Sequence, residues 1–330
     1  MNRVPRRRFL LAGAALAAAR AAGVRAQANK PLRIIWFSAG TPERNKPYVE
    51  AFRDGLRERG YRENENVVID YYWRGETLKT YNWMASDIVG EKPDVIVATC
   101  EISAKAAKEA TDSIPIVLAA STDPVAHGLI NSLAHPGTNL TGLSFNEIEI
   151  GAKRIELLRE VVPGLRRVGT ITREGESMSD VELKRLQEMV EARNYELVGY
   201  RLRDDADFAA AFEAMRAAKV DGILDYSSLS VTFPYREKFT ALALESRIPV
   251  AYHLREMVEA GGLMSYGPVA PASFHRAAYY VDRIAKGARA AELPVEQPTR
   301  FELAVNLKTA RALGIEFPQS ILLRADTVIA

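Results

Sequence analysis

The segment Ser121 to Gly142, STDPVAHGLINSLAHPGTNLTG, gathers residue types that could do chemistry. It holds His127 and His135, two of the chain's four histidines, and Asp123 just before a proline. Histidine shuttles protons near neutral pH and binds metal ions. Metal sites usually add further Cys, His, Asp or Glu ligands at short spacing, and here Asp123 is the only one nearby. We therefore expect a surface loop and no metal site.

The rest of the chain carries no strong catalytic motif. The phosphate-binding G-x-x-x-x-G-K-[ST], the nucleophile elbow G-x-S-x-G and the zinc motif H-E-x-x-H are all missing. The first expected strand is followed by AGTPERN, which lacks the dinucleotide fingerprint G-x-G-x-x-G. Cys100 could be a nucleophile, although a small apolar residue at a strand end is the simpler interpretation. We expect no cofactor and no enzymatic activity.

Residues 1–28 have the pattern of a secretory signal peptide. A basic start precedes an apolar run from Phe9 to Ala19, and the segment ends in Ala26-Gln27-Ala28. The run is about 11 residues long, whereas a membrane span needs roughly 20. RRRFL resembles the twin-arginine signal R-R-x-F-L, but Pro5 stands where that signal usually has Ser or Thr. The Sec route and a retained anchor remain alternatives.

Removal of this segment changes the charge of the chain. Its six arginines account for the formal net charge of +2, and the remainder has 38 basic and 42 acidic residues, a net charge of −4. No basic excess is left to attract nucleic acid, so we expect no nucleic-acid partner. Because Cys100 is the single cysteine, no intramolecular disulfide forms, and the core must hold the fold.

Buried-strand patterns alternate with helical patterns along most of the chain. LRIIWFS, NVVIDYYW, DVIVAT and IPIVLAA are separated by segments with helical apolar spacing, which is typical of parallel βαβ units. The plan recurs: IPIVLA at Ile114 is followed 134 residues later by IPVAYH, and PDVIVAT at Pro93 is followed 127 residues later by VDGILDY. The chain is therefore predicted to form two similar α/β lobes.

The C-terminal tail decides the predicted domain boundaries. SFHRAAYYVDRIAKG is amphipathic, and a strand (301–305) and a helix ending near Gly314 follow it. About 60 residues are too few for a third domain. We therefore expect lobe one to comprise residues 29–144 and 268–330, and lobe two residues 145–267. Crossings near residues 143–147 and 265–268 would form a multi-strand hinge beside a cleft.

The candidate binding residues follow the expected strands, because ligands of open parallel sheets bind outside the strands' carboxyl ends. Hydroxyls and helix N-termini there suit a carboxylate. Asp123 or Glu101 could pair with an ammonium, and Tyr226 or Tyr252 could cover an apolar side chain. Helix capping is the alternative role for the Ser, Thr and Asp residues. The full set is Gly40, Thr41, Thr99, Cys100, Glu101, Ser103, Ser121, Thr122, Asp123, Tyr226, Ser227, Ser228, Tyr252 and His253.

Several segments, in this order, resemble the ABC-transporter substrate-binding protein family that includes the tryptophan- and tyrosine-binding type. They are IPIVLAASTDPVAHGLINSLAHPGTNLTG, KRIELLREVVPGLRRV, GGLMSYG, RAAYYVDRIAKG and ELPVEQPTRFELAVNLKTARALGI. The resemblance spans about residues 32–329 and implies a type I periplasmic-binding-protein fold. It also implies delivery of a solute to a membrane permease and ATPase, with no chemistry by this chain.

The resemblance is less informative about the ligand. In the aromatic amino acid binders of the family, small hydroxyl residues at the first-lobe strand ends hold the carboxylate, and Gly40-Thr41 and Ser121-Thr122-Asp123 lie at comparable places. The third strand instead ends in TCEIS, where Glu101 adds a negative charge. Either Glu101 points away, or the ligand has a cationic group there.

We therefore expect a monomeric periplasmic protein that closes on an amino acid or related small carboxylate, aromatic ones included, for an ABC permease and ATPase. Two alternatives remain. One is a ligand-sensing subunit of a membrane receptor, and the other is a cleft enzyme that uses Cys100 or His253.

Overall fold

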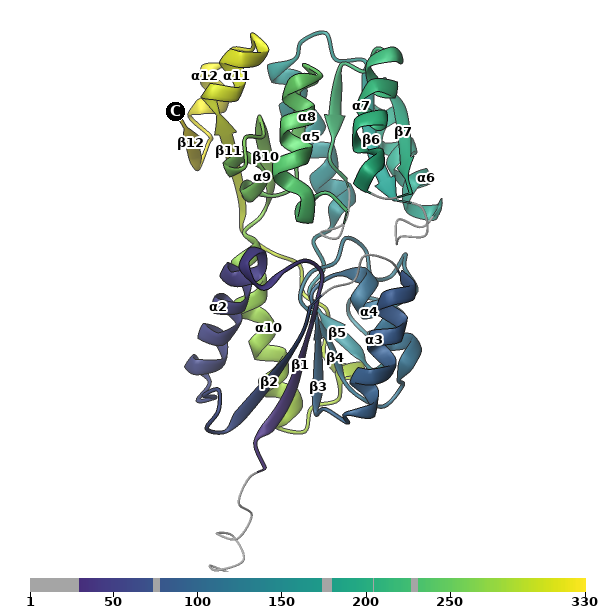
Figure 1. The fold of residues 1–330 in the computed structure, drawn as a ribbon, viewed down its shortest axis with the longest axis vertical. Helices are drawn as coiled ribbons and strands as arrows, with labels where there is room; N and C mark the ends of the chain where they lie inside the picture. The colour runs from purple at the N-terminus through teal and green to yellow at the C-terminus, as the bar shows by residue number, and fades with distance from the viewer. Residues whose placement is uncertain (1–29, 74–77, 174–179, 204, 227–230) are drawn as a thin grey trace, which may run out of the picture.

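Two α/β lobes lie one above the other along the long axis of the molecule (Figure 1). The computed structural model describes residues 30–73, 78–173, 180–203, 205–226 and 231–330. The predicted signal peptide, Ser227 and Ser228 lie outside these residues. No helix in the described part of the chain has the length and apolar character needed to cross a membrane.

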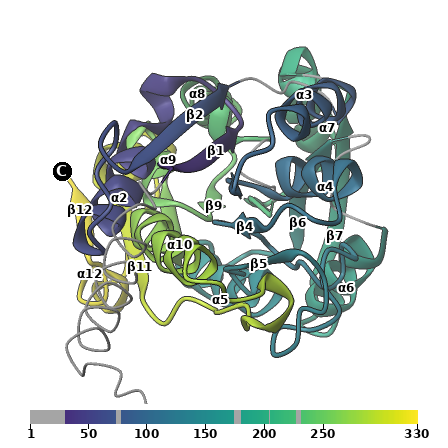
Figure 2. The ribbon, with the colours of Figure 1, turned by 90° about the horizontal axis from the view of Figure 1, so that it is seen from below.

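The first lobe contains a five-stranded parallel sheet with the order β2-β1-β3-β4-β5. Its strands are β1 (Leu32–Ser38), β2 (Val67–Trp73), β3 (Val95–Ala98), β4 (Ile116–Leu118) and β5 (Leu140–Gly142). Helices α2 (Pro42–Glu58) and α10 (Ala270–Ala285) lie side by side, apart from α3 (Leu78–Gly90) and α4 (Glu101–Ala110) (Figure 2).

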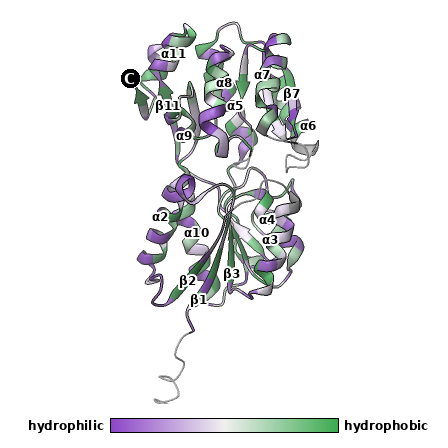
Figure 3. Ribbon diagram, in the orientation of Figure 1, coloured by the Kyte–Doolittle hydropathy of each residue, from purple (hydrophilic) through white to green (hydrophobic). Residues whose placement is uncertain are grey.

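Both faces of this sheet are buried, which explains the continuous apolar runs in the sequence. Ile34 and Trp36 of β1 belong to the core that includes α2 and α10, while Ile35 and Phe37 belong to the core under α3 and α4. Figure 3 shows these strands as largely hydrophobic, whereas α2 also carries hydrophilic residues. The predicted alternation of strands and helices is therefore present in lobe one.

The second lobe contains a seven-stranded sheet with the order β12-β11-β10-β9-β8-β6-β7. Its strands are β6 (Arg167–Arg173), β7 (Glu196–Leu202), β8 (Gly222–Leu224), β9 (Val250–Tyr252), β10 (Met264–Pro268), β11 (Phe301–Asn306) and β12 (Thr327–Ile329). Its α-helices are α5 (Glu147–Val161), α6 (Asp180–Glu191), α7 (Phe208–Ala217), α8 (Arg236–Glu245), α9 (Arg255–Glu259), α11 (Leu307–Leu313) and α12 (Gln319–Leu322). Short 3-10 helices are η1 (Asp205–Asp207) and η2 (Phe233–Tyr235), with η3 (Ala290–Glu292) beside lobe one.

The tail departs from the prediction that residues 268–330 complete the first lobe. Helix α10 does pack on α2, but β11 runs antiparallel to β10, with Met264 opposite Val305 and Pro268 opposite Phe301. Residues from 301 onward therefore belong to the second lobe, and their assignment to lobe one was wrong. The physical reason is burial, because Leu303 and Ile321 fill the same core as Met264.

In the part of the chain that the structure describes, there are consequently three crossings between the lobes: after β5, between β10 and α10, and between η3 and β11. The first and third crossings are bonded together. The backbone N–H of Glu296 donates to the Gly142 carbonyl (3.0 Å), and Ser144 N–H donates to the Glu296 carbonyl (2.9 Å). Gly142 has φ +136°, and a Cβ there would lie 2.0 Å from the Leu118 carbonyl oxygen, so glycine is required.

A buried charge cluster ties the start of α5, directly after the first crossing, to the ends of β8 and β9. Glu147 forms an ion pair with Arg154, whose Nη1 donates to the Asp225 carbonyl at 2.5 Å. Asp225 Oδ2 lies 2.8 Å from His253 Nδ1. Burial lowers the pKa of Arg154 to about 10, opposed by the charge of Asp225, so the guanidinium stays charged at neutral pH.

The position of the tail can be tested with Ile321→Ala. Ile321 is fully buried in the second-lobe core, and its truncation should destabilise the protein by about 2–5 kcal/mol. Hydrogen exchange should rise in β10 and β11 and stay unchanged in β1 and β3. The matched variant Ile88→Ala, in α3 of the first lobe, should give the reverse pattern. Faster exchange of β1 in Ile321→Ala would contradict the assignment.

The charge cluster can be tested with Arg154→Ala, which leaves Glu147 buried without its cation. We expect a loss of about 3–5 kcal/mol in the free energy of unfolding, measured in urea. The neighbouring variant Lys153→Ala removes only an exposed pair with Glu156 and should lose less than about 1 kcal/mol. Equal losses for the two variants would show that the cluster contributes no stability.

Candidate functional site

A pocket lies between the lobes, at the carboxyl ends of β1 and β3. Its cavity volume is about 20 Å³, room for about one water molecule, and it combines small or polar strand-end residues with aromatic rings. Its lining residues are Ser38, Ala39, Gly40, Arg44, Asn45, Tyr48, Thr99, Cys100 and Phe274 from the first lobe, and Phe233 and Pro234 from the second. Gly40, Thr99 and Cys100 were predicted from the sequence.

The loop after β1 is shaped by Asn45, a residue that the sequence analysis did not single out. Asn45 Nδ2 donates to the carbonyls of Ala39 (2.8 Å) and Thr41 (3.0 Å), and its Oδ1 accepts from Ser38 Oγ (3.2 Å). Gly40 has φ +79°, and a Cβ there would lie 3.3 Å from Asn45 Nδ2. Thr41 is exposed and does not line the pocket. An asparagine side chain thus holds the backbone that borders the pocket.

The end of β3 is organised by a helix cap. Cys100 precedes α4, its N–H donates to Ser103 Oγ (3.3 Å), and Ser103 Oγ donates to the Cys100 carbonyl (2.8 Å). Both side chains are buried. Thr99 Oγ1 donates to Ser38 Oγ at 3.0 Å, which joins the ends of β3 and β1. The capping role considered for Ser103 is therefore present, and Thr99 and Cys100 face the pocket.

Glu101 is turned toward the neighbouring strand end. It is 2% exposed, and its Oε1 accepts from Ser121 Oγ (3.1 Å) and from the Thr122 N–H. Two donors expected for a ligand carboxylate are thus bonded to a carboxylate of the chain itself. The first turn of α4 also favours this negative charge. Glu101 forms no ion pair with any residue that the structure describes.

Asp123 connects the two lobes instead of standing free in the pocket. Its Oδ2 lies 2.6 Å from Arg185 Nη1 of α6, and its Oδ1 accepts from Val125 N–H at 3.1 Å. His127 is half-buried beside Thr122, and His135 is exposed. Within the described ranges, no three His, Cys, Asp or Glu side chains are grouped so that they could hold a metal ion.

The second lobe presents different groups from those predicted. Tyr226 packs against Gly151 of α5, and Tyr252 packs against Phe239 of α8 with ring centroids 6.1 Å apart. Both tyrosines are 1% exposed and absent from the pocket lining. His253 is buried against Asp225, and its Nε2 has no hydrogen-bond partner among the described residues. Ser227 and Ser228 lie outside them.

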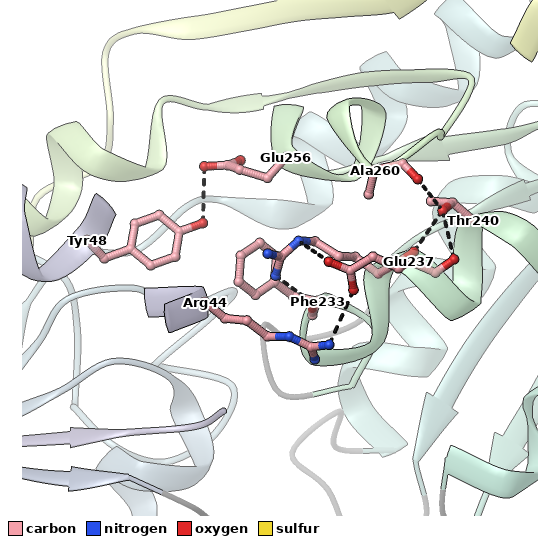
Figure 4. Close-up of polar contacts among 8 residues, drawn as sticks. Arg44, Tyr48, Phe233, Glu237, Thr240, Glu256 and Ala260 are labelled. Carbon is pink, nitrogen blue, oxygen red and sulfur yellow. Dashed lines mark hydrogen bonds and ion pairs between the residues drawn. The ribbon is translucent and has the colours of Figure 1, made fainter. Parts of the chain in front are cut away.

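Helices α2 and α9 and the 3-10 helix η2 meet at a seam between the lobes (Figure 4). Tyr48 Oη donates to Glu256 Oε1 at 3.1 Å, and Arg44 Nη2 lies 3.3 Å from Glu237 Oε2. The rings of Tyr48 and Phe233 are 5.7 Å apart. Neither Tyr48 nor Phe233 is among the residues predicted from the sequence. Their functional position depends on contact between lobes.

Comparison with known proteins agrees with this architecture. Residues 43–329 match the family described as ABC transporter substrate binding protein. A tyrosine-binding protein of Clostridioides difficile is 27% identical over 267 residues, which cover 81% of this chain and 76% of that protein.

Two solved structures are similar over nearly the whole chain. A conserved domain protein of Vibrio cholerae has 28% identity and a TM-score of 0.83, and an ABC domain of Streptococcus pneumoniae in complex with L-Trp has 24% identity and a TM-score of 0.82. Each covers 91% of this chain and 100% of the compared one. The chain belongs to the family of ABC transporter substrate-binding proteins, which bind solutes outside the cytoplasm and are not enzymes.

Proposed function

We propose that the protein binds an amino acid with an aromatic side chain in the pocket between its lobes and delivers it to an ABC permease and ATPase. The observation that carries this proposal is the lining of the pocket, which combines the hydroxyl residues Ser38 and Thr99 with the aromatic residues Tyr48, Phe233 and Phe274. Polar groups of this kind orient a ligand, and rings bury its apolar part. The tyrosine-binding relative and the structure that holds L-Trp support the same ligand class.

The charge of Glu101 favours a ligand that carries an ammonium group. Four acidic side chains are buried among the described residues: Glu101, Glu147, Asp225 and Asp282. The last three lie beside Arg154, His253 and Lys286, respectively, whereas Glu101 has no basic partner. A buried carboxylate without a cation is unfavourable. Glu101 does not itself line the pocket, but it directly follows Cys100, which does. The ammonium of an amino acid bound beside this strand end would supply the missing positive charge.

We further propose that the protein acts in the periplasm as a monomer. The first 28 residues support this location, because their basic start, apolar run and Ala26-Gln27-Ala28 end have the pattern of an export signal that is removed. RRRFL favours the twin-arginine route. Mass spectrometry of the exported protein would give its N-terminus, and residue 29 is the expected one.

The ligand class can be tested by thermal unfolding in the presence of single amino acids. L-Tryptophan, L-tyrosine and L-phenylalanine should each raise the melting temperature more than L-leucine or L-aspartate. A ligand present at 100 times its Kd should add about 2.7 kcal/mol of stability. If only non-aromatic solutes raised the melting temperature, the aromatic assignment would be wrong while membership of the family would stand.

The role of Glu101 can be tested with Glu101→Gln and two ligands that differ by the ammonium group. Affinity for L-tyrosine should fall about 10- to 100-fold, since hydrogen bonds to charged groups contribute about 1.5–3 kcal/mol. Affinity for 3-(4-hydroxyphenyl)propionate, which lacks the ammonium, should change little. The control Asp282→Asn alters another buried acid of lobe one, outside the pocket. Equal losses for both ligands would exclude an ammonium contact.

A further inference from the structure

Tyr48 occupies a position shared by the first-lobe core, the pocket and the seam. It lies on α2 and is 2% exposed. Its ring stacks on Phe274 of α10, with centroids 4.6 Å apart and an angle of 20° between the planes. On the second-lobe side, its centroid is 5.7 Å from that of Phe233. All three rings line the pocket. One tyrosine therefore contacts both lobes and borders the binding space.

The hydroxyl of Tyr48 adds a directional contact across the seam. It donates to Glu256 Oε1 on α9 at 3.1 Å (Figure 4). Burial and the nearby Glu256 carboxylate raise the pKa of Tyr48 well above its ordinary value, so the phenol keeps its proton at neutral pH. This hydrogen bond is part-buried, and one to a carboxylate is stronger than one between neutral groups. The Tyr48–Glu256 bond is thus suited to hold α2 against α9.

Two ion pairs between the lobes, among the residues that the structure describes, are more exposed than Tyr48. The side chains of Arg44 and Glu237 are 35% and 57% exposed, and those of Arg185 and Asp123 are 47% and 21% exposed. Pairs in contact with solvent contribute little and are screened by salt. The buried tyrosine is therefore the contact of this seam with the largest expected effect on the angle between the lobes.

We propose that Tyr48 is a positioning residue that couples filling of the pocket to closure of the lobes: its ring forms a wall of the pocket, and its hydroxyl latches α2 to α9. The inference rests on the solute-binding function of the cleft and does not depend on which solute binds. A ligand that packs on the ring favours the arrangement in which the hydroxyl reaches Glu256, and the latch in turn favours the binding-competent state.

The chain offers a matched control in Tyr61. Its hydroxyl donates to Asp282 Oδ1 at 3.1 Å, the same distance and the same chemistry, but both residues lie in the first lobe. Tyr61→Phe removes a tyrosine–carboxylate bond without touching the seam. Tyr48→Phe keeps the ring in the pocket wall and removes only the latch. Both variants lose the same kind of bond, so a difference between them in lobe closure is due to the location of the Tyr48 bond at the seam.

Closure can be measured by the distance between two spin labels, one on each lobe. Trp83 of the first lobe and Leu323 of the second are 68% and 79% exposed and can be changed to cysteine, while the native Cys100 is buried. Without added ligand, Tyr48→Phe should raise the ratio of open to closed molecules by about 2- to 10-fold, the effect of one hydrogen bond. Tyr61→Phe should leave the ratio unchanged.

Glu256→Ala removes the same bond from the second lobe and should match Tyr48→Phe. The double variant should then be no more open than either single one. The latch would be overturned if the label distances in Tyr48→Phe and Glu256→Ala were the same as in the wild type. It would also be overturned if Tyr61→Phe shifted the label distances as much as Tyr48→Phe does.

A titration with L-tryptophan provides the second readout. The apparent affinity for L-tryptophan should fall in Tyr48→Phe, by a factor no larger than the factor by which the fraction of closed molecules falls. In Tyr61→Phe the affinity should not fall. An affinity loss in Tyr48→Phe with an unchanged label distance would overturn the coupling. If no aromatic amino acid bound the wild type, the proposed ligand class would fail. The label distances measured without ligand would still show whether the Tyr48–Glu256 bond favours closure.

Discussion

The backbone pairing of Glu296 with the strand that leaves the first lobe is the constraint on which the rest of the molecule depends. Its N–H and carbonyl bond to Gly142 and Ser144, and its side chain pairs with Arg276 of α10 at 2.7 Å. These bonds bind two of the three crossings to each other, so the crossings form one hinge. Lobes joined in this way can rotate about the hinge but keep their strand ends beside a common cleft.

The two lobes contribute different groups to the cleft. The first lobe supplies a rigid polar surface, because Asn45 holds the loop after β1 and Ser103 caps the helix after β3. The second lobe supplies Phe233, on a short 3-10 helix beside the seam. Charge is compensated in the second lobe by the cluster around Arg154, whereas Glu101 in the first lobe has no ion-pair partner among the residues that the structure describes.

Much of the fold could be predicted from local patterns. Buried parallel strands require continuous apolar runs, and amphipathic helices require a repeat of about 3.6 residues, so both kinds of element are visible in the sequence. The partner of a strand is not visible in the same way. FELAVN would suit the edge of either sheet, and its place beside β10 follows from the core that Leu303 and Ile321 share with α5. A local pattern cannot encode that choice.

The sequence by itself determined the family, the two α/β lobes and the strand ends that border the pocket, among them Gly40, Thr99 and Cys100. These features depend on local periodicity, turn chemistry and motif order, which neighbouring residues specify. Only the tertiary structure decided that β11 joins the second lobe and that Glu101 bonds to Ser121. The same holds for the approach of Tyr48 to Phe233, because contacts between residues nearly 200 positions apart arise only when both lobes have folded and met.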